Sequence, residues 1–270
     1  MDIKKVLYIS QEIDPYLNAT PMGLFSRTLS QGIQGKGAEV RSFMPKYGAV
    51  NERRNQLHEV IRLSGMNIVI DDSDHPLIIK VATLQPTRLQ VYFIDNDDYF
   101  YRHLTSTLET VERREENDER TIFFSRGTGE TVKKLRWEAD LVHCTGWITA
   151  LMPLYIRQIY NEDPSFRSCK IVFSLFNDAF DGQLADAMVD KLKMEGFTDE
   201  HLKSLITPDG KVDYIKLNKL AIDHADAIAE SSADVPAELI EYAIASGKPF
   251  MRYPGDGDQT DAYHQFYLSL

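Results

Sequence analysis

The chain has 270 residues, of which 43% are apolar and 10% aromatic, so it can bury the core of one large or two small domains. Its 30 basic and 41 acidic residues give a formal net charge of −11, which argues against nucleic acid and anionic membranes, because both attract clustered Lys and Arg. The low cysteine content, the lack of a signal-peptide pattern at the N-terminus and the lack of a membrane-length apolar run predict a cytoplasmic protein without structural disulfides.

The first predicted element is a strand over Val6–Ile9, an unbroken apolar run typical of a strand buried on both faces of a parallel sheet. Residues 18–23 predict a loop, and a helix follows from about Leu24. The residues spaced to form its buried face are Leu24, Phe25, Thr28, Leu29 and Ile33. Ligands in open α/β sheets bind at the carboxyl ends of such strands, so we expect any site to lie in this loop.

Residues 57–94 predict an antiparallel excursion from the main sheet. Its strands are expected over Leu57–Leu63, Met66–Ile70, Leu77–Leu84 and Leu89–Ile94. The acidic segment 71–76 has no ordered ligand spacing, and we expect a solvated turn there rather than a metal site. The charged segment 107–120 is likewise expected to be a solvated helix or loop.

The second half of the chain alternates helices and strands, which favours right-handed parallel crossovers. Helices are expected over 121–137, 148–156, 197–204, 214–224 and 236–244, and strands over 140–143, 170–175 and 227–229. His143, at the end of a short apolar strand, is predicted to be a hydrogen-bonded core residue, and Cys144 a small buried one. A turn-rich linker then precedes a helix from Asp261, whose aromatic stripe is expected to dock on the domain, with partner binding as the alternative.

These patterns predict an α/β fold, namely a single Rossmann-like domain with a mostly parallel sheet and an antiparallel excursion. The domain is expected to cover residues 1–246, and residues 247–270 are expected to form a linker and a C-terminal docking helix. The sequence contains no P-loop, nucleophile elbow or Cys-x-x-Cys motif, so we expect neither a cofactor nor a metal site.

Three segments of the chain match the motifs of one enzyme family. They are Ser10–Pro15, which reads Ser-Gln-Glu-Ile-Asp-Pro, Met44–Tyr47, which reads Met-Pro-Lys-Tyr, and Leu89–Phe100, which contains Val-Tyr-Phe-Ile-Asp-Asn. Over most of residues 3–245 the chain resembles bacterial glycogen synthases and plant starch synthases, the ADP-glucose-using transferases of glycosyltransferase family 5. The resemblance implies the N-terminal, glucan-acceptor half of a GT-B fold, in which the reaction takes place in the cleft between two Rossmann-like domains.

The phosphate-binding loop of this family is altered here. The lysine of its Lys-x-Gly-Gly-Leu motif falls on Asn18, and the two glycines fall on Thr20 and Pro21. The aspartate after the loop falls on Leu24, and only Gly23 remains. Proline has no amide to offer a phosphate, and a neutral asparagine cannot offset phosphate charge. We therefore expect this loop to have lost the function that the resemblance assigns to it.

A second family motif, His-x-His-Asp-Trp-x-Thr, keeps its scaffold and loses polar side chains. It stands here as His143 to Thr149, with Trp147 retained. Thr145 and Gly146 replace the inner histidine and the aspartate. The resemblance gives that aspartate a contact on the acceptor side, which glycine cannot make.

The third motif, Phe-Thr-x-His-Asn, is altered in the same way. Phe176 replaces the histidine, which the resemblance places against the donor glucose near the reacting carbon. Asn177 is retained, although an asparagine beside a strand end is more often a structural turn residue. Scaffold residues are thus kept and polar ones lost in all three motifs.

The leading hypothesis from this resemblance is a stand-alone, degenerate acceptor domain of glucan metabolism with little ADP-glucose transfer of its own. It would bind α-glucan, or pair with a complete transferase and regulate it. We expect a vestigial cleft without a catalytic residue, formed by Glu12, Asn18, Gly23, His143, Trp147 and Asn177.

Two alternatives remain open. The chain could be an active ADP-glucose-type glycosyltransferase, an α-1,4-glucan synthase that works alone or is completed by a separate chain. It could instead be a homo-oligomer that buries the wall of the old site. An exposed apolar patch would favour the oligomer, and the candidates for it are Pro21, Met22, Leu24, Phe25 and Phe176.

Overall fold

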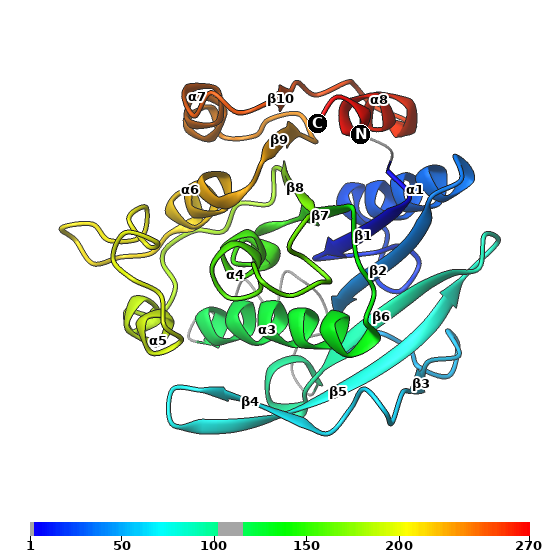
Figure 1. The fold of residues 1–270 in the computed structure, drawn as a ribbon, viewed down its shortest axis with the longest axis horizontal. Coiled ribbons are helices and arrows are strands. Elements are labelled where there is room, and N and C mark those ends of the chain that lie inside the picture. The colour runs from blue at the N-terminus through cyan, green and yellow to red at the C-terminus, as the bar shows by residue number, and fades with distance from the viewer. Residues whose placement is uncertain (1–2, 102–115) are drawn as a thin grey trace.

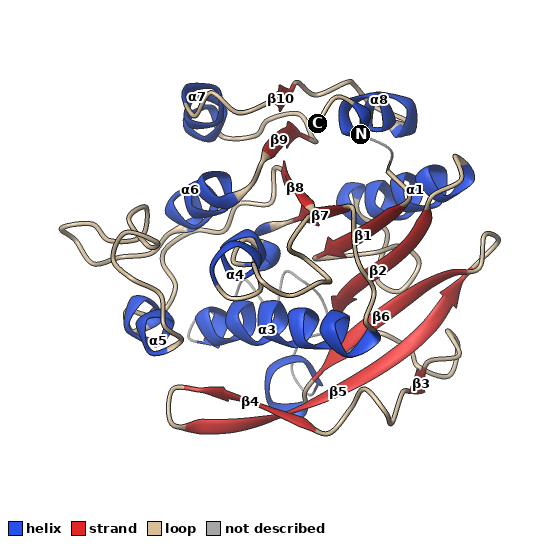
Figure 2. Cartoon of the chain, in the orientation of Figure 1, coloured by secondary structure: helices blue, strands red, loops and turns tan. Residues whose placement is uncertain are grey.

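The computed structural model of the protein describes residues 3–101 and 116–270 (Figures 1 and 2). Its strands are β1 (Lys5–Ser10), β2 (Glu39–Pro45), β3 (His58–Glu59), β4 (Met66–Ile70), β5 (Ser73–Leu84), β6 (Leu89–Asp95), β7 (Leu141–Thr145), β8 (Lys170–Leu175), β9 (Ala227–Glu230) and β10 (Phe250–Met251). Its helices are α1 (Pro21–Gly35), α3 (Asn117–Leu135), α4 (Met152–Gln158), α5 (Met188–Met194), α6 (Tyr214–His224), α7 (Ala237–Ala245) and α8 (Thr260–Leu268), with short turns η1 (Asp97–Tyr101) and η3 (Trp147–Thr149).

The described strands form one sheet in the order β10-β9-β8-β7-β1-β2-β6-β5-β3, with β4 paired to β5 beside this path. Neighbouring strands from β10 to β6 are parallel, whereas β3, β4 and β6 run antiparallel to β5. The predicted α/β fold with a mostly parallel sheet and an antiparallel excursion is therefore confirmed. β1 lies centrally, between β2 and β7, because its apolar residues Val6, Leu7 and Ile9 can be fully buried.

Helices cover both sides of this sheet (Figure 1). α1 packs on β1, β2 and α8, whereas α3 and α4 lie on the other side, in a row of contacts that continues through α6 to α7. α8 buries Tyr263 and Tyr267 against the body of the protein. A Cβ atom at Gly32 of α1 would lie 2.1 Å from the Oγ1 atom of Thr260, so α1 and α8 approach this closely only because position 32 is glycine.

α1 begins at Pro21 rather than at the predicted Leu24. Thr20 is the reason, because its side chain accepts a hydrogen bond from the Gly23 amide and caps the helix, and Pro21 follows at the first helical position. The predicted buried face was also partly wrong, since Leu24 is 56% exposed. The buried residues of α1 are Met22, Gly23, Ser26, Leu29, Ser30 and Ile33.

Of the strand predicted over Leu57–Leu63, only β3 pairs with β5. The chain turns directly afterwards, and the Leu63 amide donates to the Val60 carbonyl at 2.8 Å. Leu63 is nevertheless buried, so this apolar spacing reflects a turn packed on the core rather than a longer strand. β5 starts at Ser73, so residues 73–76, expected in a turn, pair with β4 instead.

The helix predicted over Phe197–Ser204 is wrong, because these residues form turns. Leu202 is buried as the periodicity required, but the turn closed by its amide on the Thr198 carbonyl does not continue as a helix. The helix of this region is α5, which was not predicted and which buries Met188 and Leu192.

Most of the charged segment 107–120 lies outside the described residues. Its last part contradicts the predicted solvated surface, because Asn117, Asp118 and Arg120 begin α3 and are buried. The Asp118 carboxylate pairs with the Lys191 ammonium at 2.7 Å, and Arg120 Nε donates to the Tyr99 carbonyl at 2.9 Å. Burial of charged residues is tolerated where such partners exist, and composition alone cannot foresee them.

Candidate functional site

The loop after β1 folds back on the start of α1, at the edge of the sheet where β1, β7, β8 and β9 end (Figure 1). Glu12 is buried in this loop and accepts a hydrogen bond from the Thr20 hydroxyl. The same hydroxyl accepts the Gly23 amide at 2.9 Å, and the Gly23 carbonyl accepts the Asp14 amide at 3.0 Å. Glu12 and Gly23 thus hold the loop on α1, while Asn18 is exposed at its surface.

The first turn of α1 leaves few backbone amides for a ligand. Pro21 has no amide hydrogen, and the Gly23 amide is already bonded to the cap. The Leu24 amide donates to the Thr20 carbonyl at 3.0 Å. Anions bind helix N-termini through unpaired amides, so this turn is a poor site for a phosphate group.

Gly146, directly after β7, cannot carry a side chain in this backbone. Its φ is +89°, and a Cβ atom there would lie 2.6 Å from the Cβ atom of Gln11. Gln11 itself is fixed in this space, because its Oε1 atom accepts the Ile148 amide at 3.3 Å. The place next to Gly146 is therefore filled by the β1 loop.

Asp178 was not predicted from the sequence, and it joins two of the altered motifs. Its carboxylate accepts the Tyr214 hydroxyl at 2.7 Å and the backbone amide of the buried Trp147 at 3.0 Å. Burial raises the pKa of Asp178 to about 6, with a further upward contribution from the charge of Glu12. Asn177, beside it, is exposed, and its backbone amide donates to the Ser232 hydroxyl at 2.8 Å. The only sequence signal for Asp178 is its position after a strand end.

His143 lies in the core and forms hydrogen bonds there, as predicted from the sequence. It is fully buried, with Nδ1 2.5 Å from the Tyr267 hydroxyl and Nε2 2.5 Å from the Ser174 hydroxyl. The Tyr8 hydroxyl is 3.2 Å from that of Tyr267 and extends the chain of polar atoms. Burial lowers the pKa of His143 to about 3, so the imidazole is neutral near neutral pH. Its polar atoms fix α8 to the sheet.

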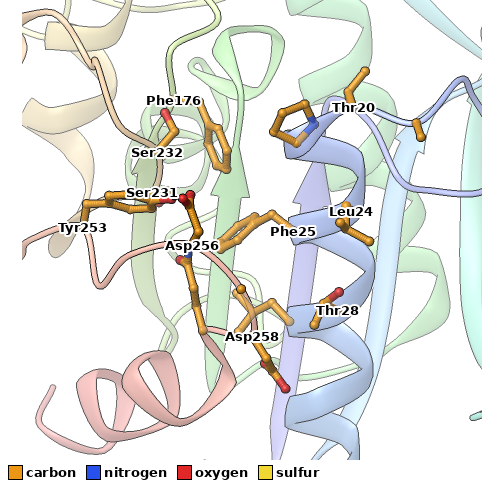
Figure 3. A pocket seen from close by; sticks show the side chains of 15 residues that line it. Thr20, Leu24, Phe25, Thr28, Phe176, Ser231, Ser232, Tyr253, Asp256 and Asp258 are labelled. Atoms are coloured by element: carbon orange, nitrogen blue, oxygen red, sulfur yellow. Dashed lines mark hydrogen bonds between the residues drawn. The ribbon is translucent and has the colours of Figure 1, made fainter.

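A pocket of about 630 Å³ opens where α1 faces the ends of β8 and β9 (Figure 3). One wall comes from residues 19–29, and Phe176 with the serines after β9 forms the wall opposite. The segment between β10 and α8 closes the third side with Tyr253, Asp256, Gly257, Asp258 and Gln259. The rings of Phe25 and Phe176 pack edge to face across the pocket, with 5.1 Å between their centroids.

None of the six predicted site residues lines this pocket, although Thr20 and Phe176 from the same motifs do. The lining includes the carboxylates of Asp256 and Asp258 and contains neither lysine nor arginine. Among residues 3–101 and 116–270, no group of three or more metal-ligating side chains is arranged to hold a metal ion. In the same residues no helix is both long and apolar enough to cross a bilayer.

A family model described as the starch synthase catalytic domain matches residues 5–248 of the chain. The chain belongs to this family. It is 31% identical to a glycogen synthase from Pelodictyon phaeoclathratiforme over 237 residues, which are 87% of this chain and 47% of the relative. It is 37% identical to a glycogen synthase from Chlorobium chlorochromatii over 174 residues, which are 64% of this chain and 36% of the relative. This starch synthase-family chain thus spans about half the length of the curated relatives it matches.

A solved structure of the catalytic domain of starch synthase IV from Arabidopsis thaliana, bound to ADP and acarbose, has the same fold. It superposes with a TM-score of 0.74 at 19% sequence identity, over 97% of this chain and 53% of that chain. The resemblance to the N-terminal half of a GT-B starch synthase is therefore confirmed for the fold. In this member of the starch synthase family, Pro21, Gly146 and Phe176 lie in the segments that follow β1, β7 and β8.

Proposed function

We propose that the chain is a degenerate acceptor domain of the starch synthase family, which binds α-glucan or a partner transferase and transfers little or no glucose from ADP-glucose. The observation that carries this proposal is the state of the sheet edge. Capping bonds hold the α1 turn, the β1 loop fills the space at Gly146, and a phenyl ring stands at position 176. None of these features offers positive charge to a sugar nucleotide, and the first turn of α1 leaves few backbone amides for it.

The charges that line the pocket favour one of the family's two substrates, α-glucan, over the other, ADP-glucose. The diphosphate of ADP-glucose is anionic, and Asp256 and Asp258 would repel it in a pocket whose lining has no cationic side chain. An α-glucan is uncharged, so the same carboxylates do not oppose its binding and can accept hydrogen bonds from its hydroxyl groups. The geometry therefore supports the acceptor over the donor as ligand.

We expect no glucosyl transfer when the purified chain is incubated with radiolabelled ADP-glucose and glycogen or maltotriose. The physical reason is that Asn18 and Phe176 stand where the resemblance places a lysine and a histidine. The phosphate charge and the donor glucose therefore lack the polar partners that would stabilise them. A full-length glycogen synthase assayed in parallel serves as the positive control. Label in the glucan above the enzyme-free background would defeat the proposal and favour an active α-1,4-glucan synthase.

We also propose the cytoplasm as the site of action and residues 1–246 as the family domain, with residues 247–270 as an appended linker and docking helix. Cys144 and Cys169 are both free and buried, which suits a reducing compartment. The family match ends at residue 248, and α8 packs on α1 after it. Limited proteolysis that cuts first between residues 247 and 260 would support this division of the chain.

We expect the chain to be a monomer, because the apolar patch proposed for an oligomer is small in the folded protein. Met22 and Phe176 are only 5% and 4% exposed and Phe25 is half-buried, which leaves Pro21 and Leu24 as the exposed members. Patches of this size are common on monomers. Multi-angle light scattering should give the chain mass of 30.9 kDa. A mass of twice this value at micromolar concentration would instead support the homo-oligomer.

A further inference from the structure

We infer that a second pocket, between α1, β3 and the end of β5, binds the terminal phosphate group of a small phosphate monoester. This pocket, called the Arg54 pocket below, has a volume of about 460 Å³. It is lined by the loop after β1, by α1, by the turn before β3, by β3 itself and by the end of β5. Among the described residues it shares no lining residue with the pocket of Figure 3. The inference therefore concerns a separate site and does not depend on the proposed function.

The charge of the Arg54 pocket is the opposite of that in Figure 3. The described residues that line it include Arg27, Arg54 and His58 and no aspartate or glutamate. The chain as a whole has a formal net charge of −11, so cationic residues gathered without carboxylates are not a general property of its surface. A guanidinium group presents parallel N–H donors that match two oxygens of one phosphate group. The lining thus suits an anion of this shape.

The turn that carries Arg54 is fixed by bonds of its own. The Arg54 amide donates to Asn51 Oδ1 at 2.9 Å. The Leu57 amide donates to the Glu52 carbonyl at 2.9 Å. The Glu52 carboxylate in turn pairs at 2.8 Å with the ammonium group of Lys46, which is buried. The backbone position of Arg54 is therefore set by the core and needs no ligand.

The donors of the pocket, by contrast, are uncommitted. Within residues 3–101 and 116–270 the exposed guanidinium of Arg54 has no hydrogen bond or ion pair. In the same part of the chain, no side-chain hydrogen bond is made by the lining residues Gln56, Thr83 and Gln85. Amide and hydroxyl groups donate to phosphate oxygens as guanidinium groups do. One phosphate group would thus meet several donors that no other protein group occupies.

Arg27 forms part of the wall on α1, and its own contacts fix it there. Its Nη1 atom donates to Asp14 Oδ2 at 2.6 Å, and its Nε atom lies 3.5 Å from Gln31 Oε1. Gln31 Nε2 donates to the Gln85 carbonyl at 3.0 Å, which holds the end of β5 beside α1. Because Asp14 offsets the charge of Arg27, the net positive charge of the pocket comes chiefly from Arg54.

A terminal phosphate fits this site better than the diphosphate of ADP-glucose. A phosphate monoester carries a charge of about −1.5 to −2 at neutral pH and has three free acceptor oxygens. Each phosphate of ADP-glucose is instead bridged on two sides and has no free end. The volume of about 460 Å³ lies in the range of roughly 300–1,000 Å³ that small-molecule sites occupy, so the pocket has room for an organic group beside the phosphate.

The first test is calorimetric titration of the full chain with inorganic phosphate at low ionic strength, using Arg54→Ala and the matched control Arg53→Ala. Arg53 is exposed in the same turn and carries the same charge, but it does not line the pocket. Arg54→Ala should weaken phosphate binding about tenfold or more, as expected for loss of a charged donor, and Arg53→Ala should weaken it less than twofold. Equal losses in the two variants would show attraction by overall charge and overturn the inference. Absence of phosphate binding to the unaltered chain would also overturn it and leave the proposed function standing.

The second test compares ribose 5-phosphate, ribose and ADP-glucose as competitors of phosphate. Ribose 5-phosphate should displace phosphate from the unaltered chain, whereas ribose and ADP-glucose should not. Tighter binding of ribose 5-phosphate than of inorganic phosphate would support an esterified ligand, and the reverse order would support the free ion with the same phosphate chemistry. Displacement by ribose alone would contradict a phosphate site.

Hydrogen exchange locates the bound phosphate. Phosphate should slow exchange over residues 51–58 in the unaltered chain and in Arg53→Ala, and not in Arg54→Ala, because a ligand stabilises the segment that it contacts. Slower exchange over residues 20–24 instead would place the phosphate at the first turn of α1. That result would overturn this inference and would also contradict the loss of the family's phosphate-binding loop.

Discussion

Gly146→Asp introduces the aspartate that the resemblance assigns to this position. It is expected to lower the free energy of unfolding by about 3 kcal/mol and not to create an acceptor contact. The φ of +89° is unfavourable for any residue with a Cβ atom. That Cβ atom would also lie 2.6 Å from Gln11 Cβ and 2.9 Å from Gln11 Oε1, so the β1 loop must move. Urea denaturation of the two proteins measures the difference.

Gly196→Asp is the matched control for Gly146→Asp. Gly196 has a φ of +100°, but a Cβ atom there meets nothing within 4 Å, so this variant carries the backbone strain without the clash. Replacing Gln11 by glycine in the Gly146→Asp background should recover part of the loss, because the closest contact is then removed. If Gly146→Asp is no less stable than Gly196→Asp, the space beside Gly146 is not filled as described.

The free energy of unfolding is expected to decrease on acidification in a way that depends on His143. The pKa of His143 is about 3 in the folded protein, whereas that of an unfolded-chain histidine is about 6.5. Between these values the unfolded chain binds a proton that the folded protein does not. Stability from this residue is therefore fully present above about pH 6.5 and falls by about 1.4 kcal/mol per pH unit below it, or about 3 kcal/mol by pH 4.

The measurement is the difference in unfolding free energy between the unaltered chain and His143→Gln, taken at pH 7, 6, 5 and 4. This difference isolates His143 from Asp178, whose raised pKa of about 6 acts in the opposite direction, since it adds stability at acid pH that is lost as the pH rises through 6. His58→Gln, at an exposed position in β3, is the control and should keep the full acid sensitivity. A His143→Gln variant with the same pH dependence as the unaltered chain would mean that His143 is not held neutral.

Much of the fold follows from local patterns in the sequence. The apolar run of β1, the strand β8 over Lys170–Leu175 and the helix α6 over Tyr214–His224 all match their predicted ranges closely. In each case the burial pattern is encoded by neighbouring residues. α5 was not predicted although its buried residues Met188 and Leu192 have helical spacing, whereas the apolar spacing around Leu202 predicts a helix where the chain forms turns. Apolar spacing alone does not separate a short helix from turns packed on the core.

The loss of a phosphate and donor site, which the residues at Asn18, Pro21 and Phe176 indicate, stays a prediction. The capped turn of α1, with Pro21 at its first position, is consistent with it. Gln11 and Asp178 escaped prediction, because their roles depend on contacts through space with Gly146 and Trp147. The position of the C-terminal tail at the sheet edge was not predicted for the same reason. It is set by buried contacts of α8, which no local sequence pattern reveals.

Calorimetric titration of the purified chain with ADP-glucose and, separately, with a malto-oligosaccharide tests the central claim most directly. A surviving acceptor module without a phosphate-binding loop should release or absorb heat with the malto-oligosaccharide and give no binding isotherm with ADP-glucose. Clear ADP-glucose binding would contradict this account, because Asn18 and Phe176 would then not mark a lost donor site, and the transferase would become the favoured function.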